Sequence, residues 1–423
     1  MYIQAMQIDH IRSIQRLNFE LAPEECPGWH VFIGENGSGK STVLRAAALA
    51  LIGPDPAQAL RQNWGDWLSG AGEFGVAELM LLVDEPGHEP QQSKAMRQEI
   101  AKVLIRRDRG RGSYLEAGAP SFRGEWMWAF DRGGANFSAS YGPFRRFTGG
   151  AEYTKLTQSF PRLAPHLTIF GEDAALTETQ EWLRELKFKQ LEERTEGGLL
   201  DRIETFVNQD GFLPHRAKLV DVTSDGVFFE DANGQRVSVD NLSDGYRSIL
   251  SMTFDLIRHM KNAFGDREIF SEDSAKVIAS GVVLIDEVDA HLHPTWQRRI
   301  GFWLHEHFPN LQFIVTTHSP LVCQAAVNGS VWKLPKPGTD EVCRRVEGQD
   351  LDRLLYGDLV DAYSTRLFGI TDTRADEGKA KLERLAQLNL QEVFRGLSDP
   401  ERKEQSHLRA ILPTQANTSE NDS

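Results

Sequence analysis

The chain has 423 residues, 40% of them hydrophobic, which is enough for a large buried core and suggests two or three structural units. Its 61 acidic residues outnumber its 47 basic ones, so the net charge is −14 and any contact with nucleic acid must be local. No stretch approaches the roughly 20 apolar residues of a membrane-spanning helix, the first residues do not have the layout of a signal peptide, and the 3 cysteines show no metal-like or disulfide spacing. We therefore expect a cytoplasmic protein with no membrane partner.

The N-terminal region begins with two segments typical of strands, 2–8 and 14–21, in which apolar and polar residues alternate. Residues 29–33 are typical of a buried strand and lead directly into Gly34. The alanine- and leucine-rich stretch 41–52 favours a helix, and 76–83 favours another strand. A glycine-rich loop therefore connects a strand to a helix, which is the setting that a phosphate loop requires.

The loop itself, Gly34-Glu35-Asn36-Gly37-Ser38-Gly39-Lys40-Ser41, matches the pattern GxxxxGK[ST] at every position. Glycines let backbone N–H groups surround phosphate oxygens, and the N-terminus of the following helix adds a favourable potential. We predict that Lys40 bridges the β and γ phosphates of ATP, that Ser41 holds Mg²⁺ and that Thr42 bonds the α phosphate. The residues predicted to bind the nucleotide here are Gly34, Asn36, Gly37, Ser38, Gly39, Lys40, Ser41 and Thr42.

The middle of the chain is predicted to be an inserted region of mixed character. Residues 91–111 indicate a basic helix, 126–141 are aromatic and rich in glycine, and 177–193 return to helical periodicity. The basic segment could contact nucleic acid or form a solvated helix face, and the second interpretation is the commoner one for a run of charges. Its cationic residues are Lys94, Arg97, Lys102, Arg106, Arg107, Arg109 and Arg111.

A second group of regular elements follows. Residues 227–239 predict a β-hairpin that turns at Asn233-Gly234, and a helix that runs to Met260 opens at 242–245. The short apolar runs 282–285 and 313–317 predict parallel strands covered on both faces, and a last strand is expected near 331–334.

From about residue 371 the chain becomes charged and helical, and we expect 414–423 to be a disordered tail. An apolar stripe on the charged helix either packs on the protein's own head or docks a partner. The stripe consists of Leu382, Leu385, Leu388, Val393 and Phe394.

Two carboxylates follow the apolar run 282–285. Asp286 and Glu287 would lie at the carboxyl end of a buried strand, where ligands bind in open α/β sheets. We predict that Asp286 is a Mg²⁺ ligand and that Glu287 polarises the attacking water, since an acid next to the metal ligand can reach the γ phosphate. Paired acids are common at strand ends, so this motif becomes specific only together with the phosphate loop.

The order of these elements resembles that of ABC-type ATPases. Leu242-Ser243-Asp244-Gly245 resembles their LSxG signature, which implies that Ser243 and Gly245 reach the γ phosphate held by the other subunit. Taken alone, Ser243 would more often be a plain helix cap. The segment 316–320 resembles the switch-histidine segment, which implies that His318 contacts the γ phosphate, and Asp289 matches the aspartate that communicates across the dimer.

Within this class the chain most resembles the AAA-15/AAA-21 branch, which includes relatives of the overcoming-lysogenization-defect proteins, RecF and the PtuA ATPases of Septu and retron defence systems. The resemblance rests on 8–14, 284–294 and 312–320 and covers about residues 1–334. It implies an α/β P-loop NTPase head with a mixed β-sheet, a helical insertion and no long coiled coil. It also implies ATP and Mg²⁺ as cofactors, with Lys40, Glu287 and His318 as the catalytic residues.

The same resemblance implies a homodimer, or a higher even oligomer, assembled through the ATP sites. It further implies a separate effector protein, such as a nuclease, in bacterial anti-phage defence. A RecF-like DNA repair ATPase and a non-hydrolysing ATP-dependent scaffold are the alternative functions.

The sequence leaves two assignments open, namely the glutamine loop and the role of a pair of histidines. The glutamine loop of ABC-type ATPases is represented by two candidates, Gln62 and the segment 141–146. The His-x-His spacing of His291 and His293 can bind zinc, but no acidic or cysteine partner is placed nearby except the acids that follow 282–285, so we expect them to shape their loop instead.

These patterns divide the chain into five regions. They are an N-terminal ATPase lobe (1–90), an inserted region (91–215), a C-terminal ATPase lobe (216–335), a helical extension (336–413) and the tail (414–423).

Overall fold

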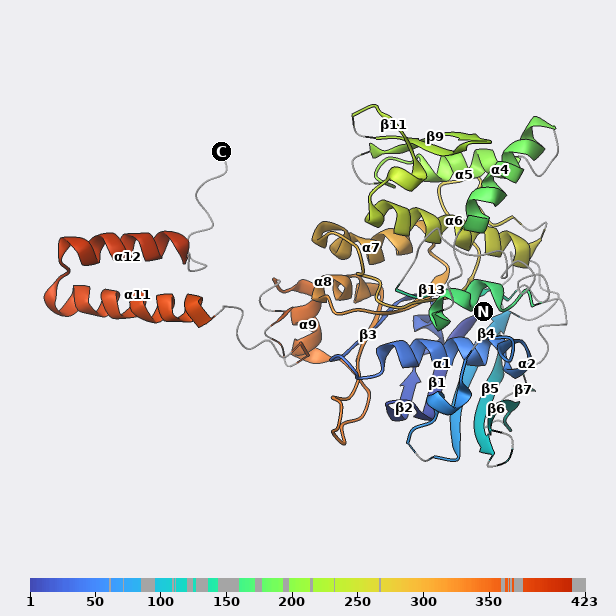
Figure 1. Ribbon diagram of the computed structural model, residues 1–423, viewed down its shortest axis with the longest axis horizontal. Coiled ribbons are helices and arrows are strands. Elements are labelled where there is room, and N and C mark those ends of the chain that lie inside the picture. Colours follow the sequence, from blue (N-terminus) through green and yellow to red (C-terminus); the bar gives the residue numbers. More distant parts are fainter. Residues whose placement is uncertain are drawn as a thin grey trace. The chain divides into compact units, whose positions relative to one another are not determined.

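The computed structural model divides the chain into two units, Met1–Ala362 and Tyr363–Ser423 (Figure 1). The residues that it describes are 1–60, 62–70, 72–84, 96–108, 110, 112–119, 125–126, 136–143, 160–171, 177–192, 198–213, 216–231, 233–265, 268–358, 362–363, 365, 367–368 and 376–412. None of the helices within these ranges is both long and apolar enough to cross a membrane. The mixed α/β fold expected from the sequence is confirmed.

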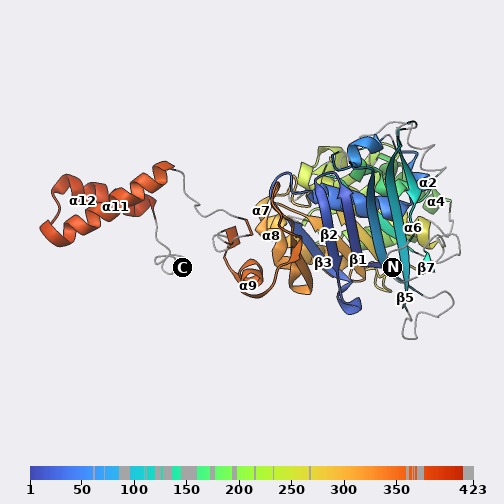
Figure 2. The same ribbon diagram turned by 90° about the horizontal axis from the view of Figure 1, so that it is seen from below.

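The first large sheet of unit 1 is mainly antiparallel, and Figure 2 shows its long strands side by side. Its strands follow the order β2-β1-β4-β5-β6, and β7 pairs with β5 in parallel. Their bounds are β1 (Tyr2–Ile11), β2 (Ile14–Glu20), β4 (Phe74–Asp84), β5 (Met96–Asp108), β6 (Gly112–Ala117) and β7 (Glu125–Trp126). The strands predicted at 2–8, 14–21 and 76–83 are therefore confirmed.

The helix expected over 91–111 is wrong. Residues 96–108 form β5, and 96–106 of it pair with β4, whereas 85–95, Arg109 and Arg111 lie outside the described residues. Apolar β-branched side chains such as Ile100 and Val103 suit a strand, and both are buried. Lys102 lies opposite Glu78 in the ladder and forms a buried ion pair of 2.8 Å with it. Pairing with β4 thus overrides the helical pattern of charges.

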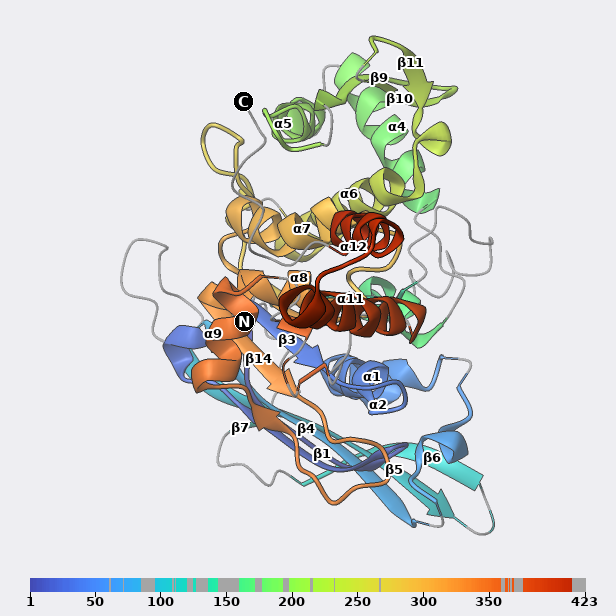
Figure 3. The ribbon, with the colours of Figure 1, turned by 90° about the vertical axis from the view of Figure 1, so that its left-hand side faces the viewer.

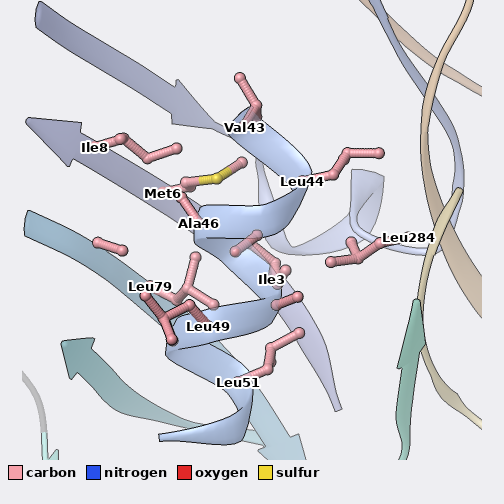
Figure 4. Close-up of a cluster of buried hydrophobic side chains, with 14 of the residues drawn as sticks. Ile3, Met6, Ile8, Val43, Leu44, Ala46, Leu49, Leu51, Leu79 and Leu284 are labelled. Atoms are coloured by element: carbon pink, nitrogen blue, oxygen red, sulfur yellow. The ribbon is translucent and has the colours of Figure 1, made fainter. Parts of the chain in front are cut away.

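Helix α1 (Lys40–Ile52) lies between the two large sheets. Figure 4 shows Ala46 and Leu49 of this helix beside Met6 of β1 and Leu79 of β4, with Leu284 on the other side. Nearly every residue of α1 is buried, and its alanines let both sheets approach closely. The helix that follows the phosphate loop is thereby held in the core of the molecule.

The second large sheet has the order β15-β14-β3-β13-β12-β8 in the described part of the chain. All of its neighbouring strands are parallel except β14 and β15. Their bounds are β3 (Gly28–Ile33), β8 (Ser138–Tyr141), β12 (Gly281–Ile285), β13 (Leu311–Thr316), β14 (Gly329–Lys333) and β15 (Arg344–Arg345). Strands β3, β12 and β13 are buried throughout, which confirms the expected coverage on both faces.

The face of this sheet opposite α1 is covered by α6 (Asp244–Phe264) and α7 (Pro294–His307) (Figure 3). A Cβ atom at Gly301 of α7 would lie 2.8 Å from the Trp29 ring of β3, so α7 can pack this closely only with glycine there. Beyond α6 a small antiparallel sheet, β11-β10-β9, accompanies α4 and α5. Their bounds are β9 (Lys218–Thr223), β10 (Gly226–Glu230), β11 (Arg236–Ser238), α4 (Thr177–Leu191) and α5 (Gly198–Val207). The predicted hairpin and the helix predicted at 177–193 are confirmed, whereas α5 was not predicted.

Short elements complete unit 1. They are η1 (Pro23–Glu25), α2 (Pro54–Ala57), η2 (Trp64–Trp67), η4 (Ala164–Phe170), η7 (Val239–Asn241), α8 (Pro320–Cys323), η8 (Gln324–Asn328) and α9 (Gly348–Tyr356).

Unit 2 is a helical hairpin of α11 (Asp376–Arg395) and α12 (Asp399–Ile411). Leu385 and Leu388 of the predicted stripe are buried in a cluster with Leu397, in the link between the helices, and Leu408 of α12, whereas Val393 and Phe394 are exposed. The stripe is thus only partly covered inside the hairpin. The tail predicted to be disordered lies outside the described residues.

Candidate nucleotide-binding site

The predicted site residues gather at one edge of the second sheet. Since β3, β8, β12, β13 and β14 are parallel, their carboxyl ends lie at the same edge, where ligands bind in open α/β sheets. The phosphate loop follows β3, the two acids follow β12, and His318 follows β13. The chain connects these loops only through long intervening segments, so the sheet is what brings them together.

The phosphate loop has the backbone of an anion cradle. Gly39 precedes α1 with a φ of 97°, in the left-handed region that side chains with a Cβ rarely adopt. A Cβ atom at this position would lie 2.9 Å from Ser13 Oγ in the turn between β1 and β2. The exposed backbone of Asn36 and Gly37 and the N-terminus of α1 are therefore available to a phosphate.

The buried hydroxyl of Ser38 fits the same interpretation. Its Oγ lies under the loop, where a Cβ atom at Gly34 would be 2.5 Å from it, and it forms no hydrogen bond with any described residue. A buried polar atom without a partner is costly in a folded protein. A phosphate oxygen in the cradle would supply the missing partner, so the residues present fit a nucleoside triphosphate.

Lys40 points its ammonium group into the loop. Its Nζ donates to the carbonyl oxygens of Gly34, at 2.8 Å, and Glu35, at 3.0 Å. Burial lowers the pKa of Lys40, while the carboxylates of Asp286, Glu287 and Asp289 act in the opposite direction. The lysine is thus held by carbonyl groups at the place where it is predicted to meet the phosphates.

Asp286 is held by a threonine that the sequence analysis did not single out. Thr316 Oγ1 donates to Asp286 Oδ1 at 2.6 Å and accepts from the backbone N–H of Glu287 at 2.8 Å. One hydroxyl at the end of β13 therefore positions both acids at the end of β12. The sequence signal was a threonine directly after an apolar strand, but its partner is set by the β12–β13 pairing.

Glu287 has a backbone conformation that is rare for its residue type. Its φ of 46° lies in the left-handed region, which costs energy for a residue with a Cβ atom. The bonds from Glu287 N–H to Thr316 Oγ1 and from Val288 N–H to the Thr316 carbonyl oxygen, at 3.0 Å, hold this turn. Strain of this kind is typical of functional sites, where it aims a side chain.

Asp289 and His318 lie on the same edge. Thr317 Oγ1 donates to Asp289 Oδ1 at 2.6 Å and accepts from the N–H of Ser319 at 2.9 Å, so one hydroxyl links the two loops. Burial and then the charge of Lys40 lower the pKa of His318, while nearby carboxylates act in the opposite direction. The side chains predicted to act together at the γ phosphate are therefore electrostatic neighbours.

The predicted signature residues stand apart from this group within one chain. Ser243 is the N-cap residue of α6 and is exposed, but its side chain forms no cap hydrogen bond. No hydrogen bond joins Ser243 or Gly245 to residues 34–42 in the described structure. Gly245 instead packs beside the loop that follows β12, where a Cβ atom would lie 3.3 Å from the carbonyl oxygen of His291. The Ser243 hydroxyl is thus not used for capping the helix.

The two candidates for the glutamine loop have different surroundings in the structure. Gln62 donates through Nε2 to the carbonyl oxygen of Phe170, at 3.1 Å, at the end of η4. Tyr141 ends β8, lies opposite Ile285 in the sheet, and accepts the N–H of Asp286 at 2.8 Å. The segment that begins at Tyr141 therefore lies beside the Asp286 loop, although 144–146 lie outside the described residues.

His291 and His293 have local structural roles. His293 caps α7 and contacts Thr295 through Nδ1, and His291 adopts a φ of 65° in the preceding turn. Among the residues that the structure describes, no group of three or more His, Cys, Asp or Glu side chains could hold a metal ion. His293 therefore has a structural role at the start of α7.

The basic segment is largely engaged with the first sheet. Besides the Lys102–Glu78 pair, Arg97 pairs with Glu99 and Arg106 pairs with Glu116. Arg107 donates to the carbonyl oxygens of Gly65 and Gly70. Lys94, Arg109 and Arg111 lie outside the described residues. Nothing in this arrangement singles out a surface for nucleic acid.

Two family models match this chain. One, described as "AAA domain, putative AbiEii toxin, Type IV TA system", matches residues 150–324, and one described as "AAA domain" matches residues 5–194. The Septu protein PtuA of Bacillus mycoides (strain KBAB4) is 26% identical over 381 residues, which are 89% of this chain and 46% of PtuA. The "Retron Ec83 probable ATPase" of Escherichia coli is 40% identical over 105 residues, 25% of this chain and 18% of that protein.

Among solved structures, a RecF–ATPrS structure of the RecFOR pathway aligns with 82% of this chain and 98% of its own, at 11% identity and a TM-score of 0.43. An SMC head bound to the C-terminal winged-helix domain of ScpA aligns with 82% of this chain and 97% of its own, at 13% identity and a TM-score of 0.45. The chain matches less than half the length of these curated relatives, PtuA and the retron ATPase.

Proposed function

Because this chain is an ABC-type ATPase of the AAA-15/AAA-21 branch, we propose that it binds Mg-ATP on residues 34–42 and hydrolyses it to ADP and phosphate. The observation that carries the proposal is the convergence of Lys40, Glu287 and His318 at one sheet edge. Their loops come from three different strands, and this edge offers an anion cradle with an unpartnered buried hydroxyl beside it.

Each residue has a role that its surroundings support. Lys40 binds the β and γ phosphates, Glu287 accepts a proton from the attacking water, and His318 contacts the γ phosphate. Ser41 and Asp286 offer the hard oxygen ligands that Mg²⁺ prefers, and Thr316 orients Asp286. Mg²⁺, when bound, supplies charge neutralisation for the phosphates.

We further propose that two heads associate head-to-tail around ATP. The exposed Ser243 hydroxyl is not engaged in capping, and neither Ser243 nor Gly245 bonds to the phosphate loop of its own chain. A second copy can bring this helix N-terminus to the γ phosphate, and Asp289 would communicate across the interface. Each ATP site would then be completed only by the partner.

The cellular task proposed here is the regulation of a separate effector, such as a nuclease, in the cytoplasm during bacterial anti-phage defence. It is supported by the similarity to Septu PtuA over 89% of this chain and to retron ATPases. Co-purification with a nuclease encoded beside this chain would support this task. ATP-dependent binding of duplex DNA by the chain alone would support a RecF-like repair function instead.

Replacement of Glu287 by Gln tests the hydrolysis step. The variant retains the size of the side chain but not its basicity, so ATP turnover should fall by roughly 10²- to 10⁴-fold while ATP binding persists. Turnover is measured by phosphate release and binding by calorimetry. The matched control is Glu306→Gln on the exposed side of α7, which should turn over ATP like the wild type. Equal turnover of the wild type and Glu287→Gln would favour the non-hydrolysing scaffold.

A further inference from the structure

A buried polar network links the acidic end of β12 to the interior of α6. It begins at the backbone of Asp286, whose N–H donates to the Tyr141 carbonyl oxygen at 2.8 Å. The two strands are parallel neighbours, with Ile285 opposite Tyr141. Tyr141 is therefore tied through its backbone to the residue predicted to hold Mg²⁺.

The side chain of Tyr141 makes the second link. It is 1% exposed, and its hydroxyl donates to Asp255 Oδ2 of α6 at 3.0 Å. The other oxygen, Asp255 Oδ1, accepts from Arg258 Nη2 at 3.0 Å and lies 3.3 Å from His259 Nε2. One tyrosine thus contacts β12 through its carbonyl group and α6 through its hydroxyl.

The charges in this network favour a strong hydrogen bond. Burial raises the pKa of Tyr141 well above its usual value, so the phenol keeps its proton and remains a donor. Burial alone would raise the pKa of Asp255, but His259 and Arg258 lower it to about 2, so the acceptor is an ionised carboxylate. Charge-assisted hydrogen bonds are shorter and stronger than neutral ones, particularly where water is excluded.

The position of Asp255 along α6 connects this contact to the signature residues. Helix α6 begins at Asp244, directly after Ser243, and Asp255 follows the helix start by 255 − 244 = 11 residues, about three turns. An α-helix of this length is a stiff element, so a restraint at Asp255 limits both tilt and sliding of its N-terminus. The positions of Ser243 and Gly245 are thereby tied, through Tyr141, to strand β12, which directly precedes Asp286.

We propose that Tyr141 is a positioning residue that couples the Asp286 loop to the N-terminus of α6. The coupling keeps Asp286 and the signature residues in a fixed position relative to each other. The coupling to ATP chemistry rests on the proposed function, whereas the restraint of α6 by Tyr141 does not. Tyr141 itself does not contact the nucleotide, because its hydroxyl acts through Asp255.

The first experiment measures the restraint directly, without nucleotide, by hydrogen exchange of peptides that cover 244–256. Tyr141→Phe removes only the hydroxyl, and we expect these amides to exchange on the order of tenfold faster. Tyr2→Phe is the matched control, since Tyr2 is also largely buried and donates its hydroxyl, at 3.0 Å, to the Asn310 carbonyl oxygen between α7 and β13 rather than to α6. The control should leave α6 unchanged, and unchanged exchange in Tyr141→Phe would overturn the inference.

The second experiment separates positioning from general destabilisation. In Tyr141→Phe, kcat for ATP should fall by about tenfold while KM stays within about twofold, because the phosphate loop is untouched. In Tyr2→Phe both constants should stay at the wild-type values. A Tyr141→Phe protein with faster exchange but unchanged kcat would overturn the coupling. Asp255→Asn, which keeps the size of the side chain, is the second variant if Tyr141→Phe does not fold.

Failure of the proposed function gives a different result. If the wild type shows no turnover, hydrolysis is refuted, and exchange with and without a non-hydrolysable ATP analogue then decides the coupling. Protection of 244–256 by the analogue in the wild type but not in Tyr141→Phe supports it. Equal protection in both proteins refutes it.

Discussion

At the residue scale, Thr316 determines how the two acids of the site are presented. Its hydroxyl donates to Asp286 and accepts from the N–H of Glu287, whose backbone is in the left-handed region. A buried carboxylate and a buried N–H would both lose a partner without it. The side chain that orients the acids thus comes from a different strand.

Replacement of Thr316 by Val, which has nearly the same shape, should lower kcat for ATP by roughly 10- to 100-fold, as is usual when a group that orients a metal ligand is lost. The dependence of turnover on Mg²⁺ should shift to higher concentration. Steady-state kinetics over a Mg²⁺ titration check both effects. Thr205→Val is the control, because that hydroxyl donates to the Asp201 carbonyl oxygen in α5. A variant with wild-type kinetics would show that Thr316 does not orient the acids.

His166 makes the stability of the protein depend on pH. Its ring nitrogens contact Ser138 Oγ at 3.1 Å and Ser140 Oγ at 2.8 Å, and burial lowers its pKa to about 3. An unfolded chain binds this proton near pH 6.5, so protons favour the unfolded state between about pH 6.5 and 3. This contribution to stability is therefore complete above pH 6.5 and is lost as the pH falls.

Replacement of His166 by Asn should reduce the slope of the unfolding free energy against pH between 6 and 4 by up to about 1.4 kcal/mol per pH unit. Urea unfolding at several pH values measures this slope. The control is Thr168→Val, which removes a hydrogen bond to the Ser140 carbonyl oxygen but no titrating group. Thr168→Val should lower the free energy of unfolding at every pH and leave its slope against pH unchanged. An unchanged slope in His166→Asn would argue against the low pKa.

At the element scale, the phosphate loop requires glycine at position 39 for two separable reasons. Gly39 needs a positive φ, and its missing Cβ leaves room for Ser13. Gly234 in the β10–β11 turn also has a positive φ, of 73°, but nothing lies within 4 Å of a Cβ atom there. Alanine substitutions at these two glycines therefore separate the stability cost of the backbone conformation from the loss of ATP binding.

Both Gly39→Ala and Gly234→Ala should lose about 1 kcal/mol of stability from the left-handed conformation. Only Gly39→Ala should lose binding of a non-hydrolysable ATP analogue, because only there does the added methyl group collide with a neighbour, Ser13, and displace the phosphate loop. Calorimetry measures the binding and thermal unfolding measures the stability. Binding by Gly39→Ala with wild-type affinity would contradict the assignment of the cradle.

At the scale of the whole molecule, the separation of Ser243 from the phosphate loop of its own chain predicts complementation between two inactive variants. Lys40→Ala removes a phosphate-loop residue, and Ser243→Arg obstructs the signature. In a head-to-tail dimer of one chain of each kind, one site carries both defects and the other carries neither.

An equal mixture of the two variants should therefore recover roughly a quarter of wild-type turnover, since about half of the dimers are mixed and one site in each is intact. Each variant alone should be inactive. Phosphate release before and after mixing is the measurement, and mixing Lys40→Ala with Lys40→Ala is the control. No recovery would mean that each site is complete within one chain or that the heads do not exchange.

The sequence alone determined those features that depend on local geometry. The phosphate loop, its flanking strand and helix, the acids after 282–285 and the histidine after 313–317 could all be predicted, because each is a short run whose backbone conformation and chemistry are set by adjacent residues. Short uninterrupted apolar runs likewise predicted the buried strands of the second sheet.

The tertiary structure decided what depends on partners distant in the chain. It made 96–108 a strand rather than a helix, since β4 supplies the ladder and Glu78 supplies a partner for Lys102. It gave Thr316 its role, because the register of β12 against β13 sets which hydroxyl meets Asp286. It also joined Tyr141 to Asp255, residues separated by 114 positions. A pattern within a sequence window carries no information about such pairings, which arise only when the sheet assembles.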